Sequence, residues 1–339
     1  MLLCVCAVVS GAEGWEEIRA FGCAKLAWLR QFFPYPNGIP SADCRGWVIA
    51  RLSPNAFQAC FAALTRSAAK LSEGAVVAID GTTLRGSSDR RNGRRALHMV
   101  SAWANANRLS LWQVATAEKS NEYTAIHKLL ERLEPKGCIV TIDAMGCQKV
   151  IAERIVAKGA DSVLAVKENQ PHRHEAIHDS FQTAKVAQFQ HVPVSCCEHL
   201  DAGHGCYEVR HSWFVNDLST LPNPHRRIGM LKPECHHGEQ ISHECRYYIT
   251  ALEGEKVQAF ANAVRGHWGV ENRLHWVLDV TFHEGDSRIR YANAPANFNT
   301  LRQFALNLLQ RAQPAISIKQ TKFNAALDDD FRANLVFQQ

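Results

Sequence analysis

The spacing of hydrophobic and polar positions changes twice along the chain. Up to about residue 70, apolar side chains recur near helical spacing, as in 15–28 and 56–64, and predict a small helical domain. From Ala75 the pattern favours three strands and then alternating helices and strands. We expect strands at 75–80, 96–104, 109–116, 138–143 and 161–167, and helices at 121–134 and 147–158. This order predicts an α/β fold in which helices flank a mixed sheet.

The second half of the chain has a weaker pattern. Residues 172–255 alternate irregularly and predict a β-rich insertion, whereas helical spacing returns at about 256–279 and at 296–312. We therefore expect five segments: a helical N-terminal domain (1–70), the first part of a core (75–171), the insertion (172–255), the second part of the core (256–312) and a C-terminal tail without an informative pattern (313–339).

The composition is that of an ordinary globular protein, with 46% hydrophobic and 21% charged residues among 339. No apolar run reaches the roughly 18 residues of a membrane helix, and the start MLLCVCAVVSGAEGW lacks the basic residues of a signal sequence. We interpret this start as a buried helix and expect a cytoplasmic protein. The 12 cysteines are scattered, and we expect most of them to be reduced thiols in the core.

Two apolar runs each end on an aspartate. GAVVAIDGTTLRG contains Asp80 and GCIVTIDAMGC contains Asp143. Either residue alone is typical of a turn or a helix cap, and Asp-Gly is itself a turn signal. Ligands of α/β proteins, however, gather where strands end. Two carboxylates on neighbouring strands repel each other unless a cation neutralises them, and Mg²⁺ prefers such oxygen ligands.

A third carboxylate is expected in RGHWGVENRLHWVLDVTFHEGDSRIR, which spans 265–290. This stretch offers Glu271, Asp279, Glu284 and Asp286. On a helix, Glu271 shares a face with His267, Leu274, His275 and Leu278, whereas Asp279 points about 80° away from it. Glu271 is therefore the favoured candidate, although an exposed surface glutamate is the simpler reading.

Positive charge is concentrated in residues 82–98, although the whole chain carries only +5. Five arginines occur there against the single Asp89. Such a cluster is typical either of a solvated hairpin tip or of a site for a polyanionic partner. Trp268 and Trp276 leave a similar choice open, because an aromatic side chain on a helix can pack in the core or stack on unpaired bases.

A series of motifs resembles a known family. AIDGTTLRGS, AEKSNE, VTIDAMGCQK, LAVKENQ, HGCYEVR, RGHWGVENRLHWVLDVTF and NFNTLRQFALNLL look like the successive motifs of insertion-sequence transposases with an Asp-Asp-Glu (DDE) triad, and most closely those of the H-repeat-associated subgroup of the transposase 11 family. The resemblance implies an RNase H-like core, with Asp80, Asp143 and Glu271 as catalytic and metal-binding residues. It also implies Asp80 on the first strand and Asp143 on the fourth, paired beside it.

The same resemblance implies the chemistry and the partners. Two Mg²⁺ ions, or Mn²⁺ as a substitute, would lie about 3.5–4 Å apart and support phosphodiester hydrolysis and strand transfer at the element's ends. The partners would be terminal inverted repeats and target DNA, bound by a homodimer on paired ends. No association with a membrane is expected. The expected DNA contacts are Arg85, Arg90, Arg91, Arg94, Arg95, Lys119, Lys167, Arg265, Arg273, Arg288 and Arg290.

Several positions depart from the family pattern. Val264, His267 and Leu278 stand where related transposases carry tyrosine, arginine and lysine, and Cys206 and Gly285 depart from the subgroup's usual residues. The chain also begins as if a first helix were missing. The alternative is therefore a catalytically decayed, transposase-derived protein that binds DNA. A zinc-stabilised module is a further alternative, because residues 191–245 contain many cysteines and histidines, but their spacing lacks clean metal-binding pairs.

Overall fold

The computed structural model of the chain describes residues 1–68, 71–116, 122–186, 189, 194–203, 206–215, 227–237, 240–253, 256–312 and 315–337. Two compact units share these residues. Unit 1 contains Met1–Lys70, Asp80–Leu133 and Gly269–Gln339, and unit 2 contains Leu71–Ile79 and Glu134–Trp268. The chain passes from one unit to the other within strand β1 (Val76–Leu84) and within helix α9 (Val257–Val270).

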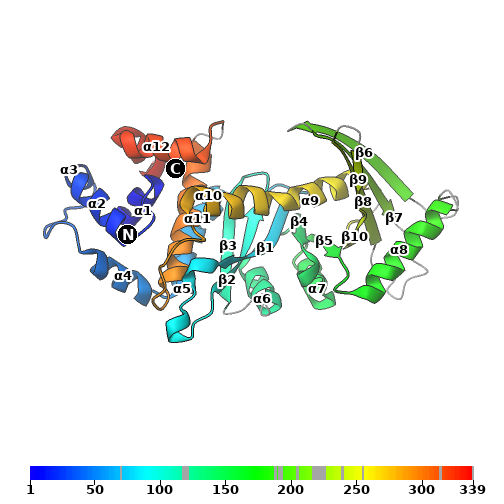
Figure 1. Ribbon diagram of the computed structural model, residues 1–339, viewed down its shortest axis with the longest axis horizontal. Coiled ribbons are helices and arrows are strands. Elements are labelled where there is room, and N and C mark those ends of the chain that lie inside the picture. Colours follow the sequence, from blue (N-terminus) through cyan, green and yellow to red (C-terminus); the bar gives the residue numbers. More distant parts are fainter. Residues whose placement is uncertain are drawn as a thin grey trace. The chain divides into compact units, whose positions relative to one another are not determined.

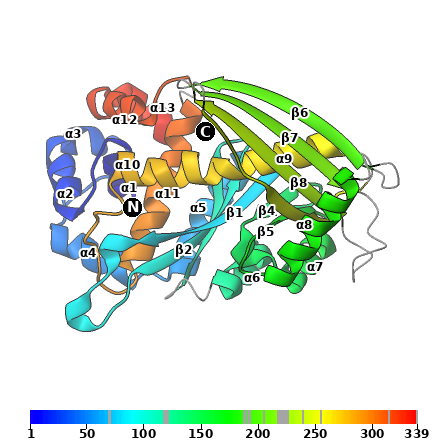
Figure 2. The same ribbon diagram turned by 45° about the vertical axis from the view of Figure 1, so that its right-hand side comes forward.

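Unit 2 contains a mixed sheet of order β1-β4-β5-β10-β8-β7-β6, with β9 paired to β8. The pairs β1–β4 and β4–β5 are parallel, and the other pairs are antiparallel. Figure 2 shows β6, β7 and β8 running side by side. The strands besides β1 are β4 (Ile139–Ile142), β5 (Asp161–Val166), β6 (Val194–Gly203), β7 (Cys206–Val215), β8 (Arg227–His237), β9 (Gln240–His243) and β10 (Arg246–Thr250).

Apolar sequence explains the central strands of this sheet. Val77, Ala78 and Ile79 of β1 are fully buried, and all four residues of β4 are buried, as is typical of parallel strands covered on both faces. Helix α9 packs on the same sheet through Phe260, which lies in one cluster with residues of β4, β5, β7, β8 and β10. Gly229 of β8 has no room for a side chain, because a Cβ there would collide with the Phe260 ring.

Helices α7 (Lys149–Ala157) and α8 (Pro171–Val186) also belong to unit 2. Helix α8 buries Ile177 and Phe181 and contacts β10, where Nδ1 of His178 lies 2.8 Å from the hydroxyl of Tyr247. The sequence predicts a β-rich segment from residue 172, but α8 occupies the start of that segment. The irregular pattern concealed the helix because only a few of its side chains are buried.

Unit 1 contains a hairpin and most of the helices. Strands β2 (Leu97–Ala104) and β3 (Leu109–Thr116) are antiparallel, in the order β3-β2-β1. The long helix α11 contacts α1, α4, α5 and β3 (Figure 1). The helices are α1 (Leu2–Val9), α2 (Trp15–Ala24), α3 (Leu26–Leu29), α4 (Ala42–Arg51), α5 (Pro54–Ala68), α6 (Glu122–Arg132), α10 (Trp276–Phe282), α11 (Ala294–Ala312), α12 (Ile318–Leu327) and α13 (Asp329–Phe337).

Helix α11 is buried on its polar side as well as on its apolar side. Asn307 pairs with the backbone of Ser110 in β3: its Nδ2 donates to the Ser110 carbonyl (2.8 Å), and its Oδ1 accepts from the Ser110 N–H (2.9 Å). Gln113 of the same strand donates to Thr300 (2.7 Å). Because β3 ends the strand order, Asn307 satisfies backbone groups of Ser110 that another strand would otherwise pair.

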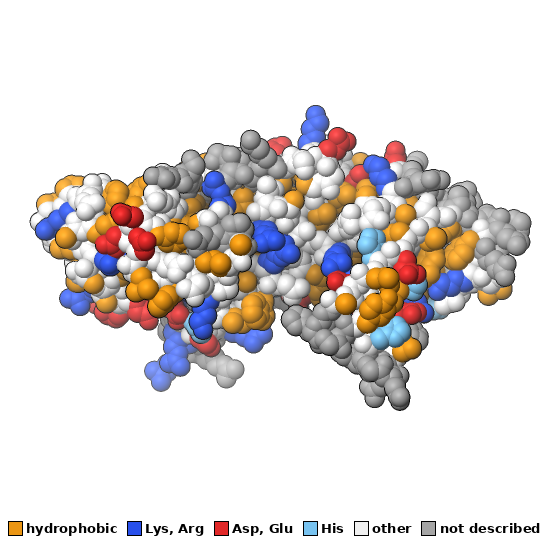
Figure 3. All heavy atoms as spheres, turned by 90° about the horizontal axis from the view of Figure 1, so that it is seen from above, with side chains coloured by type: hydrophobic (Ala, Val, Ile, Leu, Met, Phe, Trp, Pro, Cys, Tyr) orange, Lys and Arg blue, Asp and Glu red, His pale blue; other side chains and the backbone are white. Residues whose placement is uncertain are grey.

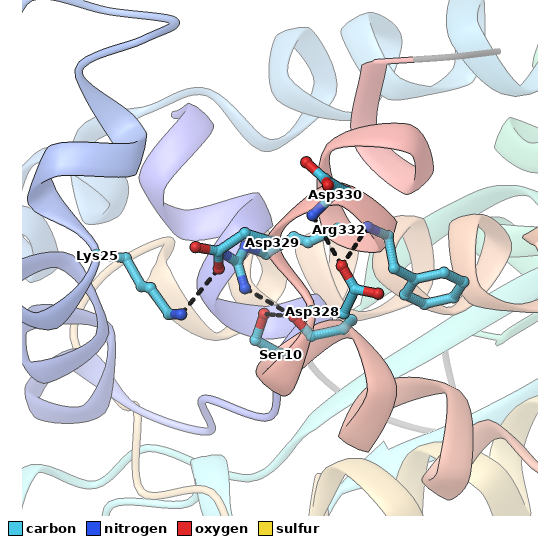
Figure 4. Close-up of polar contacts among 8 residues, drawn as sticks. Ser10, Lys25, Asp328, Asp329, Asp330 and Arg332 are labelled. Carbon is cyan, nitrogen blue, oxygen red and sulfur yellow. Dashed lines mark hydrogen bonds and ion pairs between the residues drawn. The ribbon is translucent and has the colours of Figure 1, made fainter.

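The C-terminal helices fold onto the N-terminal ones, as Figure 4 shows. Arg332 of α13 is fully buried, pairs with Asp329 and donates to the carbonyl of Ala325 (2.8 Å). Asp329 also accepts from Lys25 (2.8 Å), and the hydroxyl of Ser10 donates to the Ala325 carbonyl (3.2 Å). The tail that lacked an informative sequence pattern therefore forms two helices anchored by buried polar contacts.

Strand β1 differs from the sequence prediction at its end. The pattern predicts that the strand ends at Asp80 and that Asp-Gly turns the chain, but β1 continues through Gly81 to Leu84. A Cβ at Gly81 would lie 2.5 Å from Nε2 of His98 and 2.8 Å from Oε1 of Glu122. The glycine is thus required by close packing within unit 1 rather than by a turn. The other expected strands and helices of the core are present to within a few residues, which confirms a mixed sheet flanked by helices.

Candidate active site

Asp143 lies at the carboxyl end of β4. It begins the short helical turn Ala144–Gly146, and its Oδ1 accepts a hydrogen bond from the N–H of Met145 (3.0 Å). The side chain is half-buried. Asp143 therefore closes its strand as the sequence predicts, and it also caps the turn that follows.

Asp80 comes one residue after the part of β1 that pairs with β4. Within unit 2, Ile79 is the register partner of Ile142, so Asp80 and Asp143 are the next residues of two paired parallel strands. Within unit 1, Oδ2 of Asp80 lies 3.4 Å from Nδ1 of His275. The Asp80 side chain is 25% exposed, which leaves part of its carboxylate accessible.

Glu271 and His275 are the first and last residues of one π-helical turn between α9 and α10. Such turns interrupt α-helices frequently at functional sites. Gly269, just before the turn, allows the helix to approach the β2–β3 hairpin, because a Cβ there would collide with the Asn105 amide and lie 3.2 Å from Nε1 of Trp103. Glu271 is exposed, whereas Leu274 between the two polar residues is fully buried.

Two histidines connect this helical segment to the strands that carry the aspartates. Within unit 2, Nδ1 of His267 lies 3.0 Å from the hydroxyl of Thr141 in β4. Within unit 1, His275 faces Asp80 of β1. Glu271 stands midway between the two histidines in the sequence, at the first residue of the π-helical turn. Each histidine therefore contacts a strand of its own unit: His267 contacts β4 in unit 2, and His275 contacts β1 in unit 1.

The competing carboxylate Glu284 is committed to the core. It is 3% exposed, accepts a hydrogen bond from Nδ2 of Asn299 and lies 3.9 Å from Nη1 of Arg302. Burial raises the pKa of the Glu284 carboxyl above its ordinary value, and Arg302 and Asn299 oppose that shift. Because it is buried and paired with Asn299 and Arg302, Glu284 has a structural role. Asp279 and Asp286 are exposed.

Sequence reasoning missed a buried pair beside Asp80. His98 of β2 and Glu122, the first residue of α6, face each other with 3.6 Å between Nε2 and Oε2, and they are 2% and 6% exposed. Nδ1 of His98 lies 3.0 Å from the hydroxyl of Thr83 in β1. The motif AEKSNE, which ends on Glu122, was the available signal, but a motif alone does not indicate that its glutamate is buried.

The basic residues expected to contact DNA occupy several places. Arg85, Arg91, Arg94, Arg95, Lys167, Arg265, Arg273 and Arg288 are exposed, and Arg290 is half-buried. Lys119 and the side chain of Arg90 lie outside the described residues. Figure 3 shows described Lys and Arg side chains at several places on one face.

Three of the expected DNA contacts, Arg91, Arg288 and Arg290, line an open pocket of about 560 Å³ in unit 1, together with Ser88 and Asp89. Nε of Arg290 donates to the Gly86 carbonyl (2.9 Å), and Nη1 of Arg94 donates to the Arg290 carbonyl (3.2 Å), so the 85–95 loop and the 288–290 segment are held together. Arg265 is instead ion-paired with Asp201 in unit 2.

Both tryptophans of the helical segment are exposed, Trp268 by 42% and Trp276 by 59%. Neither tryptophan therefore packs in the core, although the core is the more usual place for an aromatic side chain on such a helix. In unit 2, the guanidinium of Arg246 lies 5.1 Å from the Trp268 ring centroid.

The donor chemistry fits a hard divalent cation. Among the described residues, no three His, Cys, Asp or Glu side chains are arranged as a metal cluster, and this includes the described part of 191–245 that suggested zinc. Asp80, Asp143 and Glu271 offer carboxylate oxygens, which Mg²⁺ prefers. In addition, His275 faces Asp80 through Nδ1, and its Nε2 is buried without a hydrogen-bond partner within the described part of the chain.

Comparison with known proteins identifies the class. A family model described as "Transposase DDE domain" matches residues 71–308, and a second, "DDE_Tnp_1-associated", matches residues 1–65. The chain therefore belongs to the DDE transposase family. None of its described helices has the length and apolar character needed to cross a membrane.

Individual relatives agree with this assignment. The chain is 37% identical to the H repeat-associated putative transposase YhhI of Escherichia coli (strain K12), over 99% of this chain and 91% of that protein. It is 39% identical to the putative transposase YncI of Escherichia coli O157:H7, over 91% and 81%. A cryo-EM structure of the piggyBac transposase synaptic complex with hairpin DNA shares a TM-score of 0.41 and 12% identity, covering 78% of this chain and 55% of that one, which is too distant to add to the argument.

Proposed function

We propose that the chain is a metal-dependent DNA transposase of a bacterial insertion sequence, which cuts phosphodiester bonds at the element's ends and joins the freed 3′ end to target DNA. Asp80, Asp143 and Glu271 are its proposed catalytic carboxylates. The observation that carries the proposal is the His275–Asp80 contact in unit 1, because it connects the helical segment that bears Glu271 to the strand that bears Asp80. The β1–β4 register supports Asp143 as the neighbour of Asp80.

The three carboxylates would hold two Mg²⁺ ions, or Mn²⁺ in their place, which supply activation of the attacking oxygen and stabilisation of the leaving oxygen. The chain's own part in the reaction is to fix the carboxylates on rigid elements. Asp143 is held by its hydrogen bond from Met145, and Gly81 packs against His98 and Glu122 beside Asp80. Such support matters because a metal site needs its ligands held within a fraction of an ångström.

The proposed DNA surface includes the arginine pocket of unit 1. Arg91 and Arg288 are exposed there. Among the residues that line the pocket, Asp89 is the one carboxylate. Guanidinium groups bind phosphate oxygens through paired hydrogen bonds, so the pocket suits a backbone phosphate. Arg85, Arg90, Arg94, Arg95, Lys119, Lys167, Arg265, Arg273 and Arg290 remain proposed contacts of the same kind.

A nicking assay tests the proposal. A labelled duplex that carries the element's own terminal repeat is incubated with Mg²⁺ or Mn²⁺ and each variant. We expect 3′-end nicking by the natural chain, and a loss of at least about 10³-fold for Asp80→Asn, Asp143→Asn and Glu271→Gln, because each removes a charge that the metal ions require. The matched control is Asp286→Asn, an exposed carboxylate of the same region, which should retain activity.

The outcomes separate this proposal from its alternative. Full activity of any of the three triad variants would contradict the assignment of that residue. No product from the natural chain on its own element ends, with binding retained, would favour the decayed DNA-binding protein. The proposal includes a homodimer on paired ends and a cytoplasmic location, and sedimentation of the protein with and without paired-end DNA tests the dimer.

A further inference from the structure

His275 differs from the other histidines that make described contacts because the carboxylate it faces, that of Asp80, is a proposed catalytic one. Its Nδ1 lies 3.4 Å from Oδ2 of Asp80, and its side chain is 10% exposed. Nε2 of the same ring is buried and has no hydrogen-bond partner among the residues that the structure describes. One ring nitrogen therefore faces a proposed catalytic carboxylate while the other is unpaired.

A purely structural role does not account for this arrangement. Buried polar atoms in folded proteins are nearly always paired, and an unpaired one calls for an explanation. His267 and His178 satisfy a ring nitrogen with Thr141 and Tyr247. A leucine at position 275 would avoid the unpaired Nε2, as Leu274 and Leu278 do nearby with fully buried side chains. A histidine at this position therefore carries a folding cost that a leucine would avoid.

The π-helical turn explains how His275 reaches Asp80. A π turn contains one residue more than an α turn, so it changes the direction of every side chain that follows it. Glu271 opens this turn and His275 closes it. Arg273 lies inside the turn, and its carbonyl accepts a hydrogen bond from Nε2 of Gln310 in α11 (3.4 Å). Helix α11 therefore supports the irregular backbone.

We propose that His275 is a positioning residue for Asp80: its Nδ1–H holds Oδ2, so that Oδ1 is presented to the metal ion. This inference rests on the proposed function, because it assumes that Asp80 binds the cation. Groups that orient a ligating carboxylate or histidine typically change metal affinity by about 10- to 100-fold when they are removed. His275 acts through Asp80 and does not itself touch the substrate.

The experiment compares three replacements of His275 in the full chain, without DNA. His275→Asn keeps an N–H near the position of Nδ1, His275→Gln moves it to the position of Nε2, and His275→Leu removes it. Mn²⁺ binding is measured by the loss of the free-ion EPR signal. We expect His275→Asn to bind within about 3-fold of the natural chain, and His275→Gln and His275→Leu to bind about 10-fold more weakly. His283→Asn, at an exposed position, is the control and should bind normally.

Unfolding of the metal-free variants is followed in parallel, so that a misfolded variant is recognised. Equal Mn²⁺ affinity of His275→Leu and the natural chain would overturn the inference, and so would equal weakening by asparagine and glutamine. Asp80→Asn distinguishes failure of the positioning role of His275 from failure of the proposed function. If it loses Mn²⁺ affinity and nicking while His275→Leu keeps both, the positioning role fails and the proposed function stands; if Asp80→Asn keeps both, the proposed function itself fails.

Discussion

Two glutamates of the same stretch of sequence, Glu271 and Glu284 in 265–290, have opposite environments. Glu271 is exposed on a π-helical turn, and the end of that turn contacts Asp80. Glu284 is 3% exposed and is surrounded by Arg302 and Asn299. Both residues are acidic and close in sequence, yet only Glu271 has a carboxylate available to a ligand. The difference shows that accessibility, rather than residue type or motif, separates a candidate catalytic acid from a structural one.

The largest expected effect is on stability and comes from replacing Glu284, the buried member of the pair. Glu284→Gln removes the main counter-charge of the buried Arg302 guanidinium and leaves only the weaker influence of Glu13, so the free energy of unfolding should fall by about 3–5 kcal/mol. Chemical denaturation at neutral pH measures it. Glu271→Gln, at an exposed position, should stay within about 0.5 kcal/mol of the natural chain.

A double variant tests the reason. Arg302→Met combined with Glu284→Gln removes both charges and should be more stable than Glu284→Gln alone. Burial raises the pKa of the Glu284 carboxyl. Unchanged stability of Glu284→Gln would therefore mean that the carboxyl is already protonated in the folded protein, and the ion-pair account would be wrong.

The next effect concerns a buried cation of the same region, Lys322. Its Nζ donates to the Thr281 carbonyl (2.6 Å), and burial lowers the pKa of its ammonium from 10.5 to about 8. Between these values the unfolded chain binds more protons than the folded one, so this group makes stability rise with pH. From pH 7 to 9.5 the natural chain should gain about 2 kcal/mol relative to Lys322→Met.

Denaturation midpoints at several pH values measure the gain, with Lys319→Met of the same helix as the control, because Lys319 is exposed. A difference between the natural chain and Lys322→Met that is independent of pH would show that Lys322 titrates in the folded protein as it does in water.

The smallest effect extends the comparison to exposed cations. Arg302 is buried and paired with Glu284, whereas Arg91 is exposed and lines the arginine pocket. Arg91→Ala should reduce the slope of log affinity against log salt for terminal-repeat DNA by about 1, since one phosphate contact is lost. Fluorescence anisotropy across salt concentrations measures this slope. An unchanged slope, or the same reduction in Lys149→Ala on α7, would remove Arg91 from the proposed DNA surface.

Much of the fold was predictable because the relevant signals are local. The strand at 109–116 and the alternation after it are present as predicted, since apolar periodicity reflects which backbone face is buried. Helix α8 and the C-terminal helices were not predicted. Their stability depends on distant partners, such as Tyr247 for α8 and Lys25 for α13, which a local pattern does not contain.

The sequence by itself determined that Asp80 and Asp143 follow buried apolar runs and that Glu271 stands between two histidines on a helix, because these relations depend only on neighbours along the chain. The tertiary structure decided that Gly81 continues a strand, that Glu284 is buried against Arg302, and that His275 faces Asp80. Each of these depends on segments far apart in sequence, whose packing sets burial and pairing. Periodicity within one segment carries no information on such contacts.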